Sequence, residues 1–161
     1  MSINYLEKVK EFRAATGLDA GQPVELHNAL IREELAELAD ALADSVVVWC
    51  GKCADGWIDH GLLELEICAI SRAAAEAGVH LDAAFNIVHE SNMSKLCTPG
   101  EIEPTRSKYN ALGVAVEFRQ VSDNLFGCYS LGGHPGYPKG KLLKSVGYHA
   151  PRWNESDAWL L

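Results

Sequence analysis

The chain has 161 residues, of which 48% are hydrophobic and 22% are charged, and its formal net charge at pH 7 is −8. This length suits one compact domain with a core and is too short for two. The composition excludes a disordered chain, a collagen-like repeat and a disulfide-only scaffold. The negative charge disfavours duplex nucleic acid and anionic membranes as partners, because polyanions repel it, whereas metal ions can mediate contact with a free nucleotide.

The cysteine count and the N-terminal residues indicate the compartment. Five cysteines cannot all pair within one chain, which favours a reducing environment. Residues 1–10 are charged and amphipathic, and no stretch approaches the ~18 uncharged apolar residues of a spanning helix. We therefore expect a cytoplasmic protein, located in the host cytoplasm if it is phage-encoded, with no membrane partner.

Residues 1–98 have the pattern of a bundle of four to five helices. Apolar residues recur at helical spacing, and Pro23 is the only proline before Pro99. We expect helices over residues 4–15, from 23 into the mid-forties, from a break between 50 and 56 to 77, and from 82 toward 95. Glycines at 17 and 78 would end the first and third of these helices, and Asp82 would cap the fourth.

Residues 99–161 are richer in proline and glycine than the residues before them and would form a small appendage of the same domain. Val114, Val116 and Phe118 alternate with polar or small residues, which predicts a half-exposed strand. A second strand near residues 125–131 would complete a β-hairpin, and residues 139–148 form a basic tail. The expected fold is therefore mainly α, with a C-terminal β-hairpin and tail.

The helix after Pro23 carries an unusual acidic pattern. At 100° per residue Glu34 lies between Leu30 and Leu38 in the apolar stripe, and Glu37 flanks it at about −60°. An inward carboxylate is costly unless it is protonated, paired or bound to a cation. Two carboxylates three residues apart can share a magnesium or manganese ion, although a charged helix with one edge glutamate explains the same pattern. Glu33, Asp40 and Asp44 fall farther round, on the expected solvated face.

A second acidic pair, Asp55 and Asp59, begins the third expected helical run. On a helical wheel both aspartates share the inward face with Glu66, and no comparable inward lysine or arginine accompanies them. Together with Glu34 and Glu37 they would repel strongly without a metal ion. The alternative is that Asp55 simply starts the helix as its cap.

Four segments between Leu26 and Trp153 together resemble the MazG-like all-α nucleoside triphosphate pyrophosphohydrolases. The family motif E-E-x-x-E is complete at residues 33–37, and residues 55–59 look like the D-G-x-I-D variant of phage-type, MazZ-like members. Residues 78–95 are similar to their fourth-helix signature, and residues 139–145 to their G-K-x-x-K-S tail. The chain between Asp59 and Gly78 is longer than in the family, so Glu66 is an alternative ligand to one aspartate.

The resemblance implies a Mg²⁺-dependent enzyme, with Mn²⁺ able to substitute, that cleaves the α–β bond of a (d)NTP to a (d)NMP and pyrophosphate. The expected substrate is a purine deoxynucleotide, dGTP or dATP, and the expected assembly is a homo-dimer or tetramer. In this scheme the metal ligands are Glu34, Glu37, Asp55 and Asp59. Glu33 would be the base that takes the proton of the attacking water, or would accept a hydrogen bond from a group bound to the metal. The phosphate-binding residues are Asn92, Lys95, Lys141 and Lys144, and Asn28 would reach the base.

Two interpretations from other classes remain open. The Trp49–Cys53 sequence W-C-G-K-C looks like a thioredoxin active site, but that fold needs alternating strands and helices around the motif, and its flanks here have a helical pattern. The other interpretation is a non-catalytic helical assembly protein with a structural cation. A zinc site is disfavoured because the chain has no second C-x-x-C.

Overall fold

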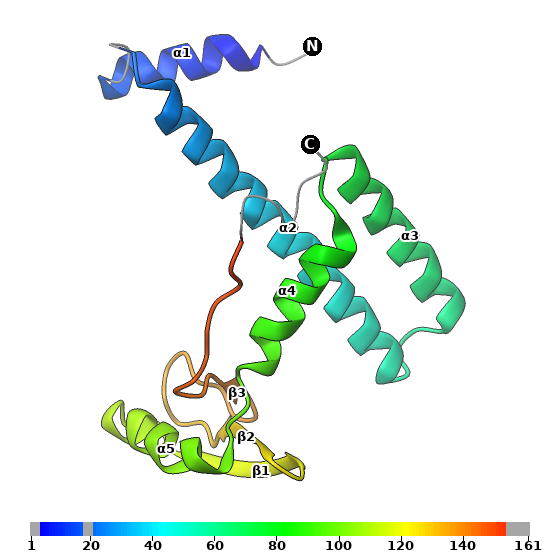
Figure 1. Ribbon diagram of the computed structural model, residues 1–161, viewed down its shortest axis with the longest axis vertical. Helices are drawn as coiled ribbons and strands as arrows, with labels where there is room; N and C mark the ends of the chain where they lie inside the picture. Colours follow the sequence, from blue (N-terminus) through cyan, green and yellow to red (C-terminus); the bar gives the residue numbers. More distant parts are fainter. Residues whose placement is uncertain (1–3, 18–20, 154–161) are drawn as a thin grey trace. The chain divides into compact units, whose positions relative to one another are not determined.

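The computed structural model describes residues 4–17 and 21–153, and the chain divides into two compact units, residues 1–38 and 39–161. The described residues form five α-helices, a short 3₁₀ helix and a three-stranded antiparallel sheet, which confirms the mainly α prediction (Figure 1). No helix among these residues combines the length and apolar character needed to cross a membrane. The change of texture predicted at residue 98 falls inside the second unit.

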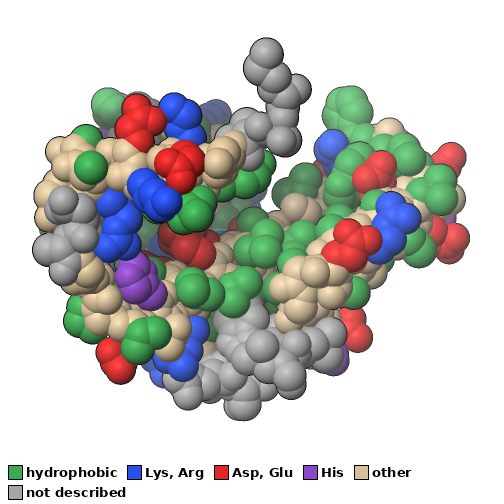
Figure 2. Space-filling model, turned by 90° about the horizontal axis from the view of Figure 1, so that it is seen from above, with side chains coloured by type: hydrophobic (Ala, Val, Ile, Leu, Met, Phe, Trp, Pro, Cys, Tyr) green, Lys and Arg blue, Asp and Glu red, His purple; other side chains and the backbone are tan. Residues whose placement is uncertain are grey.

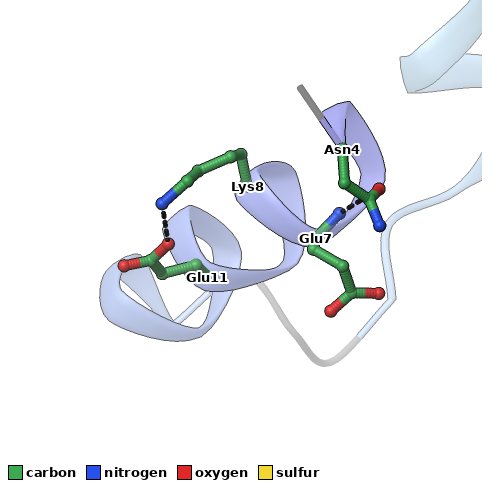
Figure 3. Close-up of polar contacts among 4 residues, drawn as sticks. All are labelled: Asn4, Glu7, Lys8 and Glu11. Atoms are coloured by element: carbon green, nitrogen blue, oxygen red, sulfur yellow. Dashed lines mark hydrogen bonds and ion pairs between the residues drawn. The ribbon is translucent and has the colours of Figure 1, made fainter. Parts of the chain in front are cut away.

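Helix α1, Tyr5–Thr16, begins and ends one residue later than its sequence predicts, and it stops at the expected glycine, Gly17. The Asn4 side chain caps it by accepting a hydrogen bond from the backbone N–H of Glu7 at 3.3 Å (Figure 3). Gly17, at φ +71°, ends it in the left-handed conformation that glycine adopts without strain. The ion pair between Lys8 and Glu11, at 2.9 Å, lies on the exposed surface of this helix.

Helix α2, Val24–Ala54, is longer than expected and runs from the first unit into the second. The prediction that it would end in the mid-forties was wrong, and the break that follows it, at residues 55–59, begins within the expected interval and extends past it. Valines 46 to 48 cost a helix only a few tenths of a kcal/mol each, and Gly51 about 1 kcal/mol. Ala39 and Ala43 are buried one turn apart, and Val46 is half-buried one turn further on. This packing outweighs the weak propensity.

Helix α3, His60–Glu76, begins later than the helical wheel assumed. Asp59 is its N-cap, and its Oδ1 accepts a hydrogen bond from the Leu62 N–H at 2.8 Å. Asp55 lies in the exposed connection after α2, in which Gly56 has φ +75°. The prediction that both aspartates share an inward helical face was therefore wrong, because the helix starts only after Asp59.

Helix α4, Leu81–Met93, follows a turn at Gly78, whose φ of +73° confirms it as the stop after α3. The cap of α4 is His80, whose Nδ1 accepts from the Ala83 N–H at 3.3 Å, and not the predicted Asp82. Asp82 instead lies in the first turn, where a carboxylate interacts well with the helix dipole.

The second unit has two hydrophobic clusters. Small side chains dominate the helical one, which contains Ala39, Ala43, Ala74, Val79, Ala84 and Val88, with Trp153 packed against them. The other lies between the sheet and α5, Ile102–Ala111, and contains Cys97, Tyr109, Val114, Cys128 and Leu143.

Strands β1, Val116–Ser122, and β2, Leu125–Ser130, form the predicted antiparallel hairpin. Two features near it were not predicted. A two-residue strand, β3, Leu142–Leu143, lies within the basic tail and pairs with β2. Helix α5 follows the 3₁₀ helix η1, Pro99–Glu101, which begins with a capping box between Thr98 and Glu101. That box, with proline at the first helical position, was the local signal for this start.

Candidate functional site

The end of α4 and the basic tail, which carry two of the motifs, form one hydrogen-bonded structure. The buried Ser145 donates from its Oγ to the Ser94 carbonyl at 2.9 Å, and its N–H donates to the Lys95 carbonyl at 3.2 Å. The buried Ser91 donates from its Oγ to the His149 carbonyl at 2.9 Å, and the His149 N–H donates to Ser94 Oγ at 3.2 Å. These contacts join residues 50 to 58 positions apart.

Helix α5 holds the same stretch of tail from another side. The Tyr109 hydroxyl donates to the Lys144 carbonyl at 2.9 Å, and Lys108 Nζ donates to the carbonyls of Lys144 and Ser145 at 3.2 and 3.3 Å. The Val146 N–H donates to Thr105 Oγ1 at 3.1 Å. The backbone of the tail is therefore fixed, while the Lys144 side chain remains exposed.

We expect Ser94→Ala to weaken this junction. The hydroxyl donates to the Ser91 carbonyl at 2.7 Å and accepts from the His149 N–H, so its loss should lower the free energy of unfolding by about 1–2 kcal/mol. Urea denaturation measures the change. The control is Ser107→Ala on the exposed surface of α5. Equal stabilities of the two variants would show that the junction contributes nothing.

A pocket of about 440 Å³ lies between these segments in the second unit. Its lining contains three lysines and no carboxylate: Lys95, Lys141, Lys144, Tyr109, Tyr137, Gly136, Leu142 and Leu143. We call it the lysine pocket. It brings together three of the side chains that the sequence assigned to phosphate binding, from segments 46 residues apart.

The three ammonium groups of the lysine pocket have neutral partners. Lys95 Nζ donates to Asn92 Oδ1 at 2.5 Å, and Lys141 Nζ donates to the Gly136 carbonyl at 3.2 Å. Lys144 Nζ lies 4.1 Å from the centre of the Tyr148 ring. Within residues 4–17 and 21–153, no carboxylate oxygen lies within 4.0 Å of any of them. The pocket therefore holds three ammonium groups without an ion-pair partner among these residues and is suited to an anion.

The positive charge of the pocket lysines affects the pKa of two acidic groups, Tyr148 and Asp40. Burial raises the pKa of Tyr148, but hydrogen bonds with Ser91 and Lys144 and the charges of Lys144 and Lys95 outweigh it, so the pKa is lowered overall. The pKa of Asp40 on α2 is raised by burial and by Asp44, while Lys95 acts in the opposite direction. Asp40 is half-buried, so its predicted place on a solvated face was wrong.

The acidic motif of α2 is exposed. Glu33, Glu34 and Glu37 are all solvent-accessible, as is Asn28. The leucines that flank Glu34 on the wheel, Leu30 and Leu38, are themselves 48% and 40% exposed. The apolar stripe of this segment is therefore not buried within the described part of the single chain.

The carboxylates that the sequence assigned to metal are suited to Mg²⁺ by their chemistry, because hard cations prefer oxygen ligands. Asp59 uses its Oδ1 to cap α3, and both Asp59 and Asp55 are exposed. Glu66 is half-buried on α3. In the part of the chain that the structure describes, no group of three or more His, Cys, Asp or Glu residues is arranged to hold a metal ion.

The cysteines fall into two kinds. Cys50 and Cys53 lie in the last turns of α2, with Cys53 Sγ 3.8 Å from His60 Nδ1. The segment before them is helical, whereas a thioredoxin-like site follows a strand, so the surroundings of this motif do not match that fold. Cys97 and Cys128 are fully buried, and burial raises the pKa of Cys128 to about 11, which keeps this thiol protonated and unreactive.

Sequence reasoning missed two residues of the site. Tyr137 lines the lysine pocket from the loop before the tail, and Lys108 supports the tail from α5. The signal for the first was the glycine- and proline-rich run around it, His134–Pro138, which is typical of a binding loop. Nothing in the local sequence marks Lys108. No protein-family model, curated protein or solved structure matches this chain, so the site is defined by its own residues.

Proposed function

We propose that the protein is a magnesium-dependent nucleoside triphosphate pyrophosphohydrolase, which converts a (d)NTP to a (d)NMP and pyrophosphate. The observation that carries the proposal is the lysine pocket, in which Lys95, Lys141 and Lys144 meet with only neutral partners. A phosphate chain supplies the negative charges that these ammonium groups lack, and charge-assisted hydrogen bonds of this kind are short and strong. The resemblance of the acidic motif to the MazG-like enzymes supports the same conclusion.

In this proposal the pocket side chains position the substrate. Asn92 holds the Lys95 ammonium group from the neighbouring turn of α4, which limits the freedom that Lys95 loses when it binds phosphate. The backbone at Lys144 is held by α5, and the Lys141 carbonyl accepts a hydrogen bond from the Ser130 N–H of β2 at 3.0 Å, so both charges reach the pocket from a fixed backbone. The tyrosine and leucine side chains of the lining limit access of water.

The metal would be held by Glu34, Glu37, Asp55 and Asp59, whose donor chemistry suits Mg²⁺ or Mn²⁺. When bound, the ion neutralises phosphate charge and lowers the pKa of a coordinated water. Glu33, beside Glu34 in the sequence, would accept the proton of the attacking water. Alternatively, it would accept a hydrogen bond from a group bound to the metal. Asn28 would contact the base.

We also propose a homo-dimer or tetramer, in the cytoplasm. The first unit contains no buried residue among residues 4–17 and 21–38. Four large apolar residues of α1 are between 53% and 76% exposed: Tyr5, Leu6, Val9 and Phe12. Figure 2 shows hydrophobic side chains interspersed with charged ones on the face that it displays. Exposed apolar surface of this kind is typical of a protein–protein interface. It would serve equally in an assembly protein without activity.

Product analysis tests the enzymatic proposal against the assembly protein. The eight common NTPs and dNTPs are incubated with the full chain and Mg²⁺, and nucleotides, pyrophosphate and orthophosphate are separated by ion-exchange chromatography. We expect equal amounts of monophosphate and pyrophosphate, with dGTP and dATP cleaved fastest, and no reaction in EDTA. Release of orthophosphate and a nucleoside diphosphate, or no product from any of the eight, would contradict the proposal.

A further inference from the structure

The lining of the lysine pocket also has an aromatic and apolar part, which the binding of phosphate charge alone does not explain. Beside the three lysines, its lining consists of two tyrosine rings, two leucines and a glycine. Gly136, at φ +84°, presents only backbone there, and the space where its side chain would lie is open. A site for inorganic phosphate alone needs no aromatic wall, whereas ligand sites for organic molecules combine such a wall with a few polar groups.

The ring of Tyr137 is held in place before any ligand arrives. It makes edge-to-face contacts with Tyr109 and His134, at centroid distances of 6.0 and 5.2 Å and interplanar angles of 75° and 65°. Its carbonyl accepts a hydrogen bond from Ser130 Oγ at 2.8 Å, and its N–H donates to the His134 carbonyl at 3.1 Å. A ring fixed in this way loses little conformational entropy when a second ring packs on it.

Lys141 connects the aromatic wall with the charged rim. Its ammonium group lies 5.9 Å from the centre of the Tyr137 ring and is bound to the neutral Gly136 carbonyl. A phosphate is a stronger acceptor than a carbonyl because it carries a full charge. Lys141 is therefore expected to move from Gly136 to an arriving phosphate, which uncovers the ring.

We infer that Tyr137 determines specificity for the nucleobase, by stacking against it while the pocket lysines bind the phosphates of the same molecule. The inference rests on the proposed function and names its substrate class as an aromatic nucleoside polyphosphate rather than an inorganic one. Asn28, which the proposed function assigns to the base, does not line this pocket, and the lining itself contains no carboxylate or amide side chain able to read the hydrogen-bonding edge of a base. We therefore expect affinity to increase with the area of the base that stacks on Tyr137. Both purine nucleotides should then bind better than the pyrimidine nucleotides and with similar affinity to each other.

The test compares two ligands on the full chain with Mg²⁺ by isothermal titration calorimetry. One is the non-cleavable α,β-methylene analogue of dGTP, and the other is inorganic tripolyphosphate, which lacks the base and sugar. We expect the analogue to bind the unmodified protein at least ~5-fold more tightly, and Tyr137→Leu to weaken the analogue by about 5- to 150-fold while tripolyphosphate changes less than ~2-fold. Tyr137→Phe should retain the affinity for the analogue.

The matched control is Tyr129→Leu, which alters a half-buried tyrosine of β2 that is absent from the pocket lining. It should leave both affinities unchanged. Equal affinity of the unmodified protein for the two ligands would overturn the inference, even if Tyr137→Leu does not fold. Equal weakening of both ligands in a folded Tyr137→Leu would also overturn it.

The proposed function and this inference fail in different ways. If the analogue binds selectively and through Tyr137 but dGTP is not cleaved, the nucleotide-binding role of the pocket stands and the proposed hydrolase activity is wrong. If dGTP is cleaved but Tyr137→Leu leaves the difference in affinity between the two ligands unchanged, the hydrolase activity stands and the role of Tyr137 is wrong. If the unmodified protein binds neither ligand, the lysine pocket has no part in nucleotide binding and the inference is wrong.

Discussion

Glu34→Gln and Glu37→Gln are expected each to lower the rate of pyrophosphate release by at least ~100-fold at saturating Mg²⁺. A neutral amide is a far poorer ligand for a hard cation than a carboxylate, so the metal would bind weakly or in the wrong place. Both side chains are exposed on α2, and the substitution keeps their size. Helix content should therefore be unchanged, and relief of charge repulsion should make the metal-free protein slightly more stable.

Steady-state kinetics, a Mn²⁺ titration and circular dichroism measure these three effects. The control is Glu64→Gln, which neutralises an exposed glutamate of α3 outside the motif. Near wild-type turnover in either variant would show that this glutamate is not a metal ligand. A loss of helix content would mean that its role is structural.

The second large effect is expected in the lysine pocket. Lys141→Ala and Lys144→Ala should each weaken binding of a triphosphate by about 10- to 150-fold, the range for hydrogen bonds to charged groups. Lys144 takes part in folding through its carbonyl, which accepts from Tyr109 and Lys108 and is retained in the alanine variant. Thermal stability should therefore change little, while the KM for the nucleotide rises.

Lys139→Ala is the matched control, because Lys139 is an exposed lysine of the same tail that does not line the pocket. It removes the same charge and should change the KM less than ~2-fold. Calorimetry with tripolyphosphate separates affinity from turnover. Equal effects of Lys139→Ala and Lys144→Ala would mean that the tail attracts anions only through its net charge, without a defined site.

Local interactions made several elements predictable from sequence alone. Helix α1 begins at a capping asparagine and ends at a left-handed glycine, and both signals act within four residues. The β1–β2 hairpin follows from the alternation around Val116 and Phe118. The lysines of the pocket were also identified from sequence, by motif resemblance, although nothing in the sequence placed them together.

The start of α3 shows how far a local pattern can mislead. A helical wheel assumes that the helix already exists, and residues 55–59 satisfy it only if the helix begins before Asp55. In the structure Asp59 caps the helix, because its carboxylate accepts from the Leu62 N–H. Helix α2 was underestimated for a related reason, since burial of Ala39 and Ala43 on the helical cluster outweighs the weak propensities of the valines that follow.

The sequence by itself determined the presence of helices α1 to α4 and the place of the hairpin, and its motifs marked the lysines that we propose bind phosphate. Only the tertiary structure decided that the α4 end and the tail join, that α5 supports them and that Tyr137 lies beside the lysines. These contacts depend on hydrogen bonds and packing between residues 35 to 58 positions apart, such as Tyr109 with Lys144 and Ser91 with His149. Such pairings leave no period in the sequence, because each depends on where the rest of the chain places its partner.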